Sequence, residues 1–278
     1  MESLLAIRNR IATIDSLIKA TNAMKIVSTA KLSRLNNLNK FSMDCAKILF
    51  EMLSFLLGDL LFSHSLETNH YLFPNPNGKR LVLIFSADQG FCGNFNHSII
   101  AEAKKIVSLD NNDIIKIFGK KAASISKNNL VQIKNKSSID AFSREVGQII
   151  LEHLQNHDIS EIVVISSRFK NILSQEAKST VIFPFPIKTG FVQYIETDND
   201  DKRELLEDLF RAYMNKLFIS IITEHSVSEF SARVISMDNS VKNAKDMSKD
   251  LGIMYNKMHQ AKITKELIEI VASIESAV

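Results

Sequence analysis

Residues 231–278 read SARVISMDNSVKNAKDMSKDLGIMYNKMHQAKITKELIEIVASIESAV, and the rest of the chain can be interpreted from this stretch. Within it and just before it, apolar or small residues recur at alternating steps of four and three. They are Phe230, Val234, Met237, Val241, Ala244, Ser248, Leu251, Tyr255 and Met258. A 3.5-residue period keeps one narrow seam of a long helix against a partner helix as the two supercoil. The pattern therefore predicts a coiled coil.

The same helix is expected to begin well before this stretch. Between Lys202 and the C-terminus there is no proline and only one glycine, Gly252, so nothing obliges the helix to stop. Residues 198–201, Asp-Asn-Asp-Asp, suit a helix start, where they can cap free N–H groups and oppose the helix dipole. At about 1.5 Å per residue, a helix over 202–276 would be roughly 110 Å long.

A second long helix is predicted at the N-terminus. Residues 2–57 contain neither glycine nor proline, and apolar residues again step by four and three. The stripe consists of Ile7, Ile11, Ile14 and Ile18, continued less strictly by Met24, Val27, Leu35 and Leu38. Two long helices with narrow apolar seams can bury those seams against each other as an antiparallel coiled coil. Up to residue 50 this helix carries eight basic and three acidic residues, which indicates either a solvated face or a surface for acidic partners.

Between two proline pairs, at 74 and 76 and at 184 and 186, the pattern changes to short apolar runs separated by amphipathic segments. Strands are predicted at 81–87, 113–119, 130–133, 161–166 and 180–183, and helices near 95–107, 120–127 and 138–156. This alternation is typical of a largely parallel sheet covered by helices.

The predicted fold class is therefore α/β: a long antiparallel coiled coil of N- and C-terminal helices with an inserted Rossmann-like α/β domain. The predicted domains are residues 1–73 for the N-terminal long helix, 74–197 for the α/β domain and 198–278 for the C-terminal long helix.

The amino-acid composition excludes several classes of protein. The net charge of +3, from 34 basic and 31 acidic residues, is too balanced to indicate a dedicated nucleic-acid binder. Cys45 and Cys92 show neither CxxC nor metal-ligand spacing, which favours a reducing, intracellular compartment over a disulfide framework or zinc site. The first residues lack the pattern of a secretory signal. The most apolar window, 48–62, is too short and too charged to span a bilayer, so we expect a soluble or peripheral protein.

Three small motifs could carry chemistry, but each is incomplete. The loop SADQGFCGNFN, residues 86–96, follows the first predicted strand and contains only GxxG, which favours a tight structural turn over a nucleotide site. Cys92 and His97 lack a third orienting group, so a nucleophile and base pair is not expected. His153 and His157 lie four residues apart on a predicted helix without a third metal ligand, and we interpret them as surface histidines. We predict no cofactor.

Separated segments of the sequence resemble one family. The segment IKATNAMKIVSTAKL, residues 18–32, resembles the lysine-rich signature of the γ subunit of F-type ATP synthase, and SADQGFCGNFN is similar to that family's glycine loop. ARVISMDNS at 232–240 and YNKMHQAKITKEL at 255–267 resemble its C-terminal motifs. The motifs occur in the family's order with an α/β insert between them, so the resemblance covers essentially the whole chain.

The resemblance implies a rotor shaft with no catalytic or nucleotide site of its own. In the family, the paired terminal helices turn inside a hexamer of α and β subunits, and the α/β domain lies with the ε subunit and the ring of c subunits. Ion flow turns ring and shaft, and the shaft drives the catalytic β subunits through ATP synthesis. One copy per complex is implied, with α, β, ε and c subunits as partners, no nucleic acid, and a peripheral location on the cytoplasmic side of the cell inner membrane.

The family motifs also imply residues that contact the surrounding subunits. By position these are Met24, Lys25, Glu229, Arg233, His259, Gln260, Thr264 and Val271. His259 stands where the family usually has arginine, which replaces a permanent charge by a side chain that can titrate near neutral pH. Gln89 replaces the arginine of the glycine loop, and Glu275 adds a charge near the end of the shaft. Residues 194–196 are a candidate foot toward the c ring.

Two other classes stay open from the residues alone. A coiled-coil scaffold or nucleic-acid-binding protein would use the basic N-terminal helix, and its binding would weaken steeply with salt. A small α/β enzyme would use the GxxG loop and would show nucleotide affinity. Neither class explains why motifs in both long helices match one family.

Overall fold

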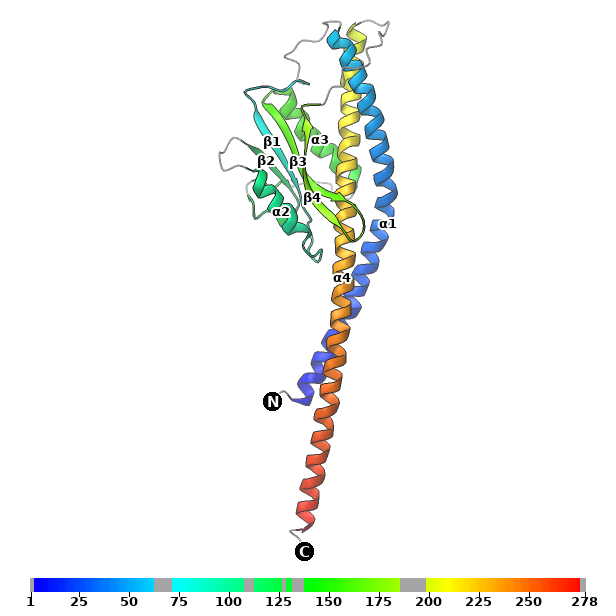
Figure 1. Cartoon of the computed structure of the whole chain (residues 1–278), viewed down its shortest axis with the longest axis vertical. Coiled ribbons are helices and arrows are strands. Elements are labelled where there is room, and N and C mark those ends of the chain that lie inside the picture. Colours follow the sequence, from blue (N-terminus) through cyan, green and yellow to red (C-terminus); the bar gives the residue numbers. More distant parts are fainter. Residues whose placement is uncertain are drawn as a thin grey trace. The chain divides into compact units, whose positions relative to one another are not determined.

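The computed structural model describes residues 3–62, 72–107, 113–126, 129–131, 138–185 and 199–275. The first and the last elements of the sequence are long helices, α1 (Leu4–Phe62) and α4 (Asn199–Glu275) (Figure 1). Between them in sequence come β1 (Lys79–Phe85), α2 (Phe95–Ile106), β2 (Ile114–Phe118), the 3-10 turn η1 (Lys120–Ala122), α3 (Ile139–Gln155), β3 (Ile159–Phe169) and β4 (Gln175–Phe183). The predicted fold class, two long helices with an α/β insert, is confirmed. The chain divides into two compact units, residues 1–28 with 234–278 and residues 29–233.

In the first unit, the start of α1 pairs with the end of α4 in antiparallel fashion. The Ser248 hydroxyl donates to Asp15 Oδ1 at 3.2 Å, and Lys25 forms an ion pair with Asp238. Ten residues forward on α1 therefore correspond to ten residues back on α4, as antiparallel pairing requires. From Met237 to the end of the predicted seam, the residues at least partly shielded from solvent are Met237, Val241, Ala244, Ser248, Leu251, Gly252, Tyr255 and Met258. The predicted seam of α4 is thus confirmed in this unit.

In α1, the residues shielded from solvent follow the repeat of four and three more strictly than the apolar residues of the sequence do. Ile7, Ile11, Ile14 and Ile18 lie in it as predicted, whereas Met24, Val27 and Leu38 are exposed, so the prediction for these three is wrong. The repeat of four and three instead passes through Thr21, Lys25, Ser28, Leu32 and Leu35. Polar side chains can occupy such positions when their groups are satisfied, and the buried Ser28 hydroxyl donates to the Met24 carbonyl at 2.9 Å.

In the second unit, residues 29–62 of α1 run antiparallel to residues 199–233 of α4. Lys202 Nζ lies 2.9 Å from Asp59 Oδ2, and Lys31 Nζ lies 5.4 Å from the centre of the Phe230 ring. The step from 31 to 59 on α1 matches the step from 230 back to 202 on α4, so one register holds between the two contacts. The side chains of Asp59 and Lys202 are only 1% and 3% exposed, and a shifted register would separate these buried charges.

The sheet has the strand order β2-β1-β3-β4. β1 is parallel to β2 and to β3, while β4 is antiparallel to β3. The turn between β3 and β4 spans residues 170–174, where Asn171 Oδ1 accepts the N–H groups of Leu173 and Ser174 at 2.9 and 2.8 Å. A connection this short makes β4 run antiparallel to β3, because a parallel strand would need a crossover of roughly a dozen or more residues. The parallel arrangement is confirmed for three strands; the antiparallel edge strand was not predicted.

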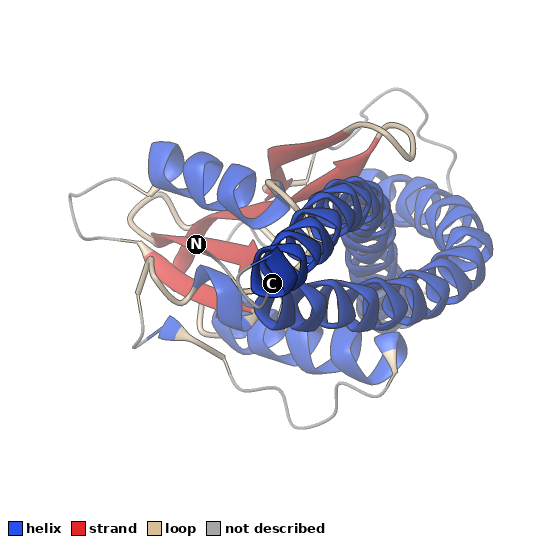
Figure 2. Cartoon of the chain, turned by 90° about the horizontal axis from the view of Figure 1, so that it is seen from below, coloured by secondary structure: helices blue, strands red, loops and turns tan. Residues whose placement is uncertain are grey.

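Alternate residues of β1 face two apolar layers, as the pleat of a strand requires. Leu81, Leu83 and Phe85 pack into a core with α3 and with both long helices, whose contributions include Leu56 and Phe210. Val82 and Ile84 pack on the opposite side against Ile99 and Ala103 of α2. Within this unit, α2 therefore covers one face of the sheet, and α3 with the helix pair covers the other (Figure 2).

Two predicted elements of the insert are corrected. The helix expected at 120–127 is only the turn η1, whose Lys121 N–H donates to the Ala87 carbonyl at 3.1 Å and so ties it to the end of β1. Of the strand expected at 130–133, Leu130 forms an isolated bridge to Ile117, and residues 132–133 lie outside the described part. The candidate foot at 194–196, the side chains at 198–200 and that of Glu275 also lie outside it.

Candidate partner-contact site

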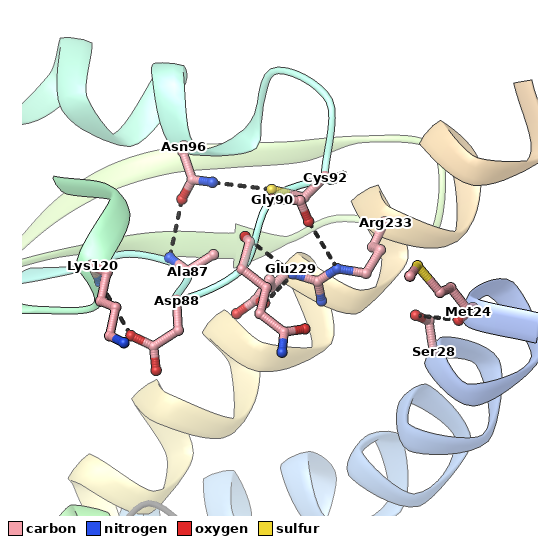
Figure 3. Close-up of polar contacts among 11 residues, drawn as sticks. Met24, Ser28, Ala87, Asp88, Gly90, Cys92, Asn96, Lys120, Glu229 and Arg233 are labelled. Atoms are coloured by element: carbon pink, nitrogen blue, oxygen red, sulfur yellow. Dashed lines mark hydrogen bonds and ion pairs between the residues drawn. The ribbon is translucent and has the colours of Figure 1, made fainter. Parts of the chain in front are cut away.

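The loop between β1 and α2 is fixed by a side chain of the helix that follows it (Figure 3). Asn96 Oδ1 accepts the Ala87 N–H at 3.0 Å, and Asn96 Nδ2 lies 3.1 Å from Cys92 Sγ. Burial raises the pKa of the Cys92 thiol, which makes it a poor nucleophile at neutral pH. The loop is therefore a tight structural turn, as its incomplete glycine motif predicts.

The end of β2 holds the same loop from its other side. Ser86 Oγ donates to the Gly119 carbonyl at 3.1 Å and accepts the Ala122 N–H at 3.1 Å. The Lys120 N–H donates to Asp88 Oδ1 at 3.1 Å (Figure 3). Gly119 has φ +104, and a β-carbon there would lie 2.0 Å from the Ser86 carbonyl oxygen. Only glycine fits at position 119.

Arg233 joins the loop to α4. Its Nε donates to the Gly90 carbonyl at 3.2 Å, and its Nη2 reaches the Gln89 carbonyl at 3.5 Å (Figure 3). Nη2 also lies 2.5 Å from Glu229 Oε1, one helical turn earlier, and the guanidinium carbon lies 5.2 Å from the centre of the Phe230 ring. Burial raises the pKa of Glu229, although the attraction of Arg233 acts the other way. We call this pair, the buried Arg233 and the largely buried Glu229, the Arg233 clamp.

A cavity of about 410 Å³ lies beside the clamp. Its walls carry two cations, Lys31 and Arg233, two carboxylates, Asp88 and Glu229, and the buried His225. His225 Nδ1 accepts the Ser167 N–H at 3.3 Å, and burial lowers its pKa to about 4, so the imidazole is neutral at pH 7. Positive and negative wall groups are equal in number, so the cavity has no excess of cations to select a phosphate group.

The eight predicted contact residues fall into separate groups. Glu229 and Arg233 bond to each other within the clamp and are largely buried. Met24 is exposed, and the partly exposed Lys25 is paired with Asp238. His259, Gln260, Thr264 and Val271 are all exposed on α4. Of these four, His259 stacks on Tyr255 with ring centres 6.0 Å apart, and Thr264 Oγ donates to the Gln260 carbonyl at 3.0 Å.

Sequence reasoning missed several residues of the site, including Asn96, Asp88 and His225. His225 had a readable signal, because it precedes Glu229 by four residues just as Glu229 precedes Arg233, which places all three on one face of α4. Asn96 stands at the second position of α2, from which a short amide side chain can reach back to the end of β1. Asp88 has no comparable spacing signal, since its partner Lys120 follows a different strand.

The histidine motifs do not form the contacts that a site would need. His97 is exposed, whereas the buried Cys92 contacts Asn96. The expectation that His153 and His157 share a helix is wrong, because α3 ends at Gln155 and His157 has φ +51. Within the described ranges, no cluster of three His, Cys, Asp or Glu side chains could hold a metal ion. Over the same ranges, no helix has the length and apolar character needed to cross a membrane.

Comparison with known proteins gives a match over the whole chain. The family model described as ATP synthase matches residues 3–277. The ATP synthase gamma chain of Sulfurovum sp. (strain NBC37-1) is 30% identical, with 99% of each chain covered. The ATP synthase gamma chain of Hyphomonas neptunium (strain ATCC 15444) is 32% identical, with 99% of this chain and 100% of the relative covered.

Solved structures share the fold at lower identity. A chain of the Euglena gracilis mitochondrial ATP synthase (OSCP/F1/c-ring) aligns with a TM-score of 0.63 at 15% identity, covering 98% of this chain and 94% of that one. A chain of the Tetrahymena thermophila mitochondrial ATP synthase central stalk/c-ring aligns with a TM-score of 0.52 at 22% identity, covering 79% and 98%. With a family model and relatives that align from end to end, this chain belongs to the ATP synthase gamma-chain family.

Proposed function

We propose that the chain is the central-stalk rotor subunit of an F-type ATP synthase, which couples ion-driven rotation of the c ring to conformational changes in the catalytic β subunits. The family match over residues 3–277 carries this proposal. The antiparallel pairing of α1 with α4 within each unit supports it, because two packed helices resist bending and twisting better than one. The subunit is non-catalytic, so the chemistry of ATP synthesis belongs to its partners.

The partners proposed are the α, β, ε and c subunits, with one copy of this chain in each complex. The chain would be held peripherally at the cytoplasmic side of the cell inner membrane through those partners. The Euglena and Tetrahymena structures that share its fold both contain a c-ring by their descriptions, which supports an assembly of this kind.

The contact residues differ in the role we propose for them. Met24, His259, Gln260, Thr264 and Val271 are exposed and would meet surrounding subunits directly, with Lys25 at the edge of that surface. Glu229 and Arg233 would act indirectly, because they are turned toward the loop between β1 and α2. We also keep the division into 1–73, 74–197 and 198–278 as a proposal.

The surface of α4 from residue 259 onward suits a contact that must slide. Apolar side chains such as Ile263, Leu267 and Ile268 are exposed there. Its charges are matched within the helix, with Lys262 Nζ 3.5 Å from Glu266 Oε1 and Lys265 Nζ 3.6 Å from Glu269 Oε1. Charges paired along one helix leave few groups that would form fixed salt bridges with a surrounding sleeve.

The alternatives considered from the sequence have less support. A nucleic-acid-binding scaffold or a small α/β enzyme would not account for a gamma-chain match over both long helices and the insert. The balanced charges around the cavity also give an enzyme no evident phosphate site.

Co-purification tests the proposed function directly. Tagged full-length chain is expressed with the α and β subunits of the same organism, and the complex is weighed by native mass spectrometry. We expect one copy of the chain for each active hexamer. A chain that stays out of the hexamer, or that forms its own oligomer, contradicts the proposal.

A further inference from the structure

The cavity beside the Arg233 clamp lies at the carboxyl ends of two parallel strands. Its lining includes Phe85 and Ser86, at the end of β1, and Phe118 and Gly119, at the end of β2. Because β1 and β2 are parallel, these residues meet at one edge of the sheet. Open α/β sheets bind small molecules in crevices outside this edge. At about 410 Å³, the cavity is within the size range of small-molecule sites.

The apolar lining of the cavity is largely aromatic. Phe85 stacks on Phe118 with ring centres 4.9 Å apart, and Phe142 of α3 meets both rings edge-on at 6.2 and 5.9 Å. Ile139 and Ile222 extend this apolar lining. An aromatic occupant would continue the stacked and edge-on contacts that are already present. The lining therefore favours a ligand with a planar apolar group.

The polar lining carries charges of both signs on different elements. Lys31 belongs to α1, and its amine lies 5.4 Å from the centre of the Phe230 ring. Asp88 belongs to the loop after β1. Arg233 and Glu229 pair with each other across one helical turn of α4. An occupant with both a negative and a positive group would complement Lys31 and Asp88 together.

His225 adds a buried hydrogen-bond donor. Its ring lines the cavity, and the residue is only 5% exposed. Because Nδ1 accepts the Ser167 N–H, Nε2 carries the proton of the neutral imidazole, and Nε2 has no acceptor among the described residues. A buried donor without an acceptor is unfavourable, so an occupant that supplies an acceptor is favoured.

From this lining we propose that the cavity binds a small zwitterion with an aromatic side chain, the chemical class of a free aromatic amino acid. Its ring would pack against the phenylalanine cluster. Its carboxylate would pair with Lys31 and accept the His225 Nε2–H. Its ammonium would pair with Asp88, since a carboxylate can accept several donors at once. The equal numbers of positive and negative wall groups disfavour a phosphorylated ligand instead.

The inference goes beyond the proposed function and is independent of it. Every residue that lines the cavity belongs to the unit of residues 29–233. The isolated full-length chain should therefore bind the ligand whether or not it also enters an ATP synthase. Failure to bind would leave the rotor proposal intact, and failure to join the hexamer would leave this site intact.

Isothermal titration calorimetry on the full-length chain tests the site, with L-phenylalanine as the probe. N-acetyl-L-phenylalanine lacks the ammonium charge, and L-phenylalanine amide lacks the carboxylate. We expect saturable binding of L-phenylalanine at a single site, and at least about fivefold weaker binding of each analogue. No saturable binding, or equal binding of all three compounds, overturns the proposal. Tighter binding of adenosine monophosphate than of L-phenylalanine also overturns it, because the site would then select a phosphate.

Two variants test which side chains hold the two charges. Lys31→Gln removes the cation, and Asp88→Asn removes the carboxylate while keeping an acceptor for the Lys120 N–H. Each should weaken the binding of L-phenylalanine at least about fivefold. Lys31→Gln should not weaken the amide further, and Asp88→Asn should not weaken the N-acetyl compound further, because each pair has already lost the contact in question.

Lys40→Gln is the matched control, since Lys40 is an exposed lysine of α1 that does not line the cavity. It should bind L-phenylalanine as the wild type does. Unchanged affinity in Lys31→Gln and Asp88→Asn contradicts the proposed site, as does an equal loss in Lys40→Gln. A variant that loses all three compounds alike would show general damage to the cavity and overturn the assignment of charges.

Discussion

Arg233 directs its guanidinium into the protein rather than to solvent. With 4% of the residue exposed, it reaches two loop carbonyls, the Glu229 carboxylate and the face of Phe230. A charge this deeply buried is tolerated only where such partners replace water. Family resemblance marks the position as a partner contact, whereas the geometry gives it a local task, which is to fix the loop between β1 and α2.

Gly119 gives a direct test of the loop packing. Gly119→Ala places a methyl group where only 2.0 Å separates it from the Ser86 carbonyl oxygen, at a φ of +104. We expect a loss of roughly 3 kcal/mol or more in the free energy of unfolding, measured by urea denaturation. Gly147→Ala is the matched control, because Gly147 lies within α3 and nothing stands within 4 Å of a β-carbon there. It should gain about 0.5–1 kcal/mol, and equal losses in both variants contradict this account.

His225 predicts a pH dependence of stability. Burial lowers its pKa from 6.5 to about 4, so between these values the unfolded chain binds a proton that the folded chain does not. Stability should therefore fall as the pH drops from 6.5 to about 4, by up to roughly 3 kcal/mol, and this effect should end below pH 4. His225→Asn keeps an acceptor for the Ser167 N–H without the titration. The measurement is the difference in unfolding free energy between the two proteins at pH 7.5, 5.5 and 4.5.

The comparison with His225→Asn is needed because two carboxylates act in the opposite direction. Burial raises the pKa values of Glu224 and Glu229, and each therefore favours the folded state at lower pH. Both proteins share these groups, so they cancel in the difference. Parallel pH curves for the two proteins would show that His225 does not titrate as described.

At the scale of elements, the two long helices could be predicted from the sequence. The periodic apolar residues and the lack of proline and glycine extend over many residues in each. The α4 seam from Met237 to Met258 follows the apolar repeat closely. The α1 seam was harder, since Lys25 and Ser28 occupy seam positions through polar contacts that no hydrophobic pattern records. The site was least predictable. Its contacts, such as Arg233 with Gly90, join residues far apart in the sequence through tertiary packing.

The pairing of α1 with α4 in the second unit predicts a strong effect at one ion pair. Asp59→Asn or Lys202→Met leaves the other charge buried, and each should cost roughly 3–5 kcal/mol of unfolding free energy. The double variant Asp59→Leu, Lys202→Met should recover most of that loss, because apolar groups then fill the same space. Urea denaturation measures all four proteins.

An exposed ion pair provides the control for this prediction. Arg144 and Asp140 lie 2.7 Å apart on α3 with both side chains more than half exposed, and Arg144→Gln should barely change stability. If the double variant at positions 59 and 202 is as unstable as the single ones, the pair is not replaceable and the polar contact itself specifies the register.

At the scale of the whole molecule, two parts of the chain differ in how they are held. The loop between β1 and α2 is held by contacts with α4 and α2. The α4 surface from His259 to Val271 is simply an exposed helix face with its charges paired along its own length. We expect this exposed helix face to set how efficiently rotation is transmitted.

His259 is the position at which transmission can be tested. Arginine there supplies a permanent, fork-shaped donor, so His259→Arg should tighten coupling between rotation and ATP synthesis and make it less dependent on pH. ATP synthesis per ion translocated is measured in the reconstituted complex from pH 6 to 8. Lys257→Arg is the control, since it changes an exposed side chain nearby without changing its charge. Identical pH profiles for wild type and His259→Arg would refute the role given to this residue.

The last part of α4 has a consequence for the life of the protein in a cell. Every side chain described from position 259 to 273 is exposed, so in a free copy this segment depends on local contacts, namely its helical hydrogen bonds and the ion pairs along its own length. Helices without tertiary contacts open readily, and open backbone is what proteases cleave. Copies without partners should therefore be degraded first at this end. Turnover would then match the abundance of the subunit to the number of complexes able to receive it.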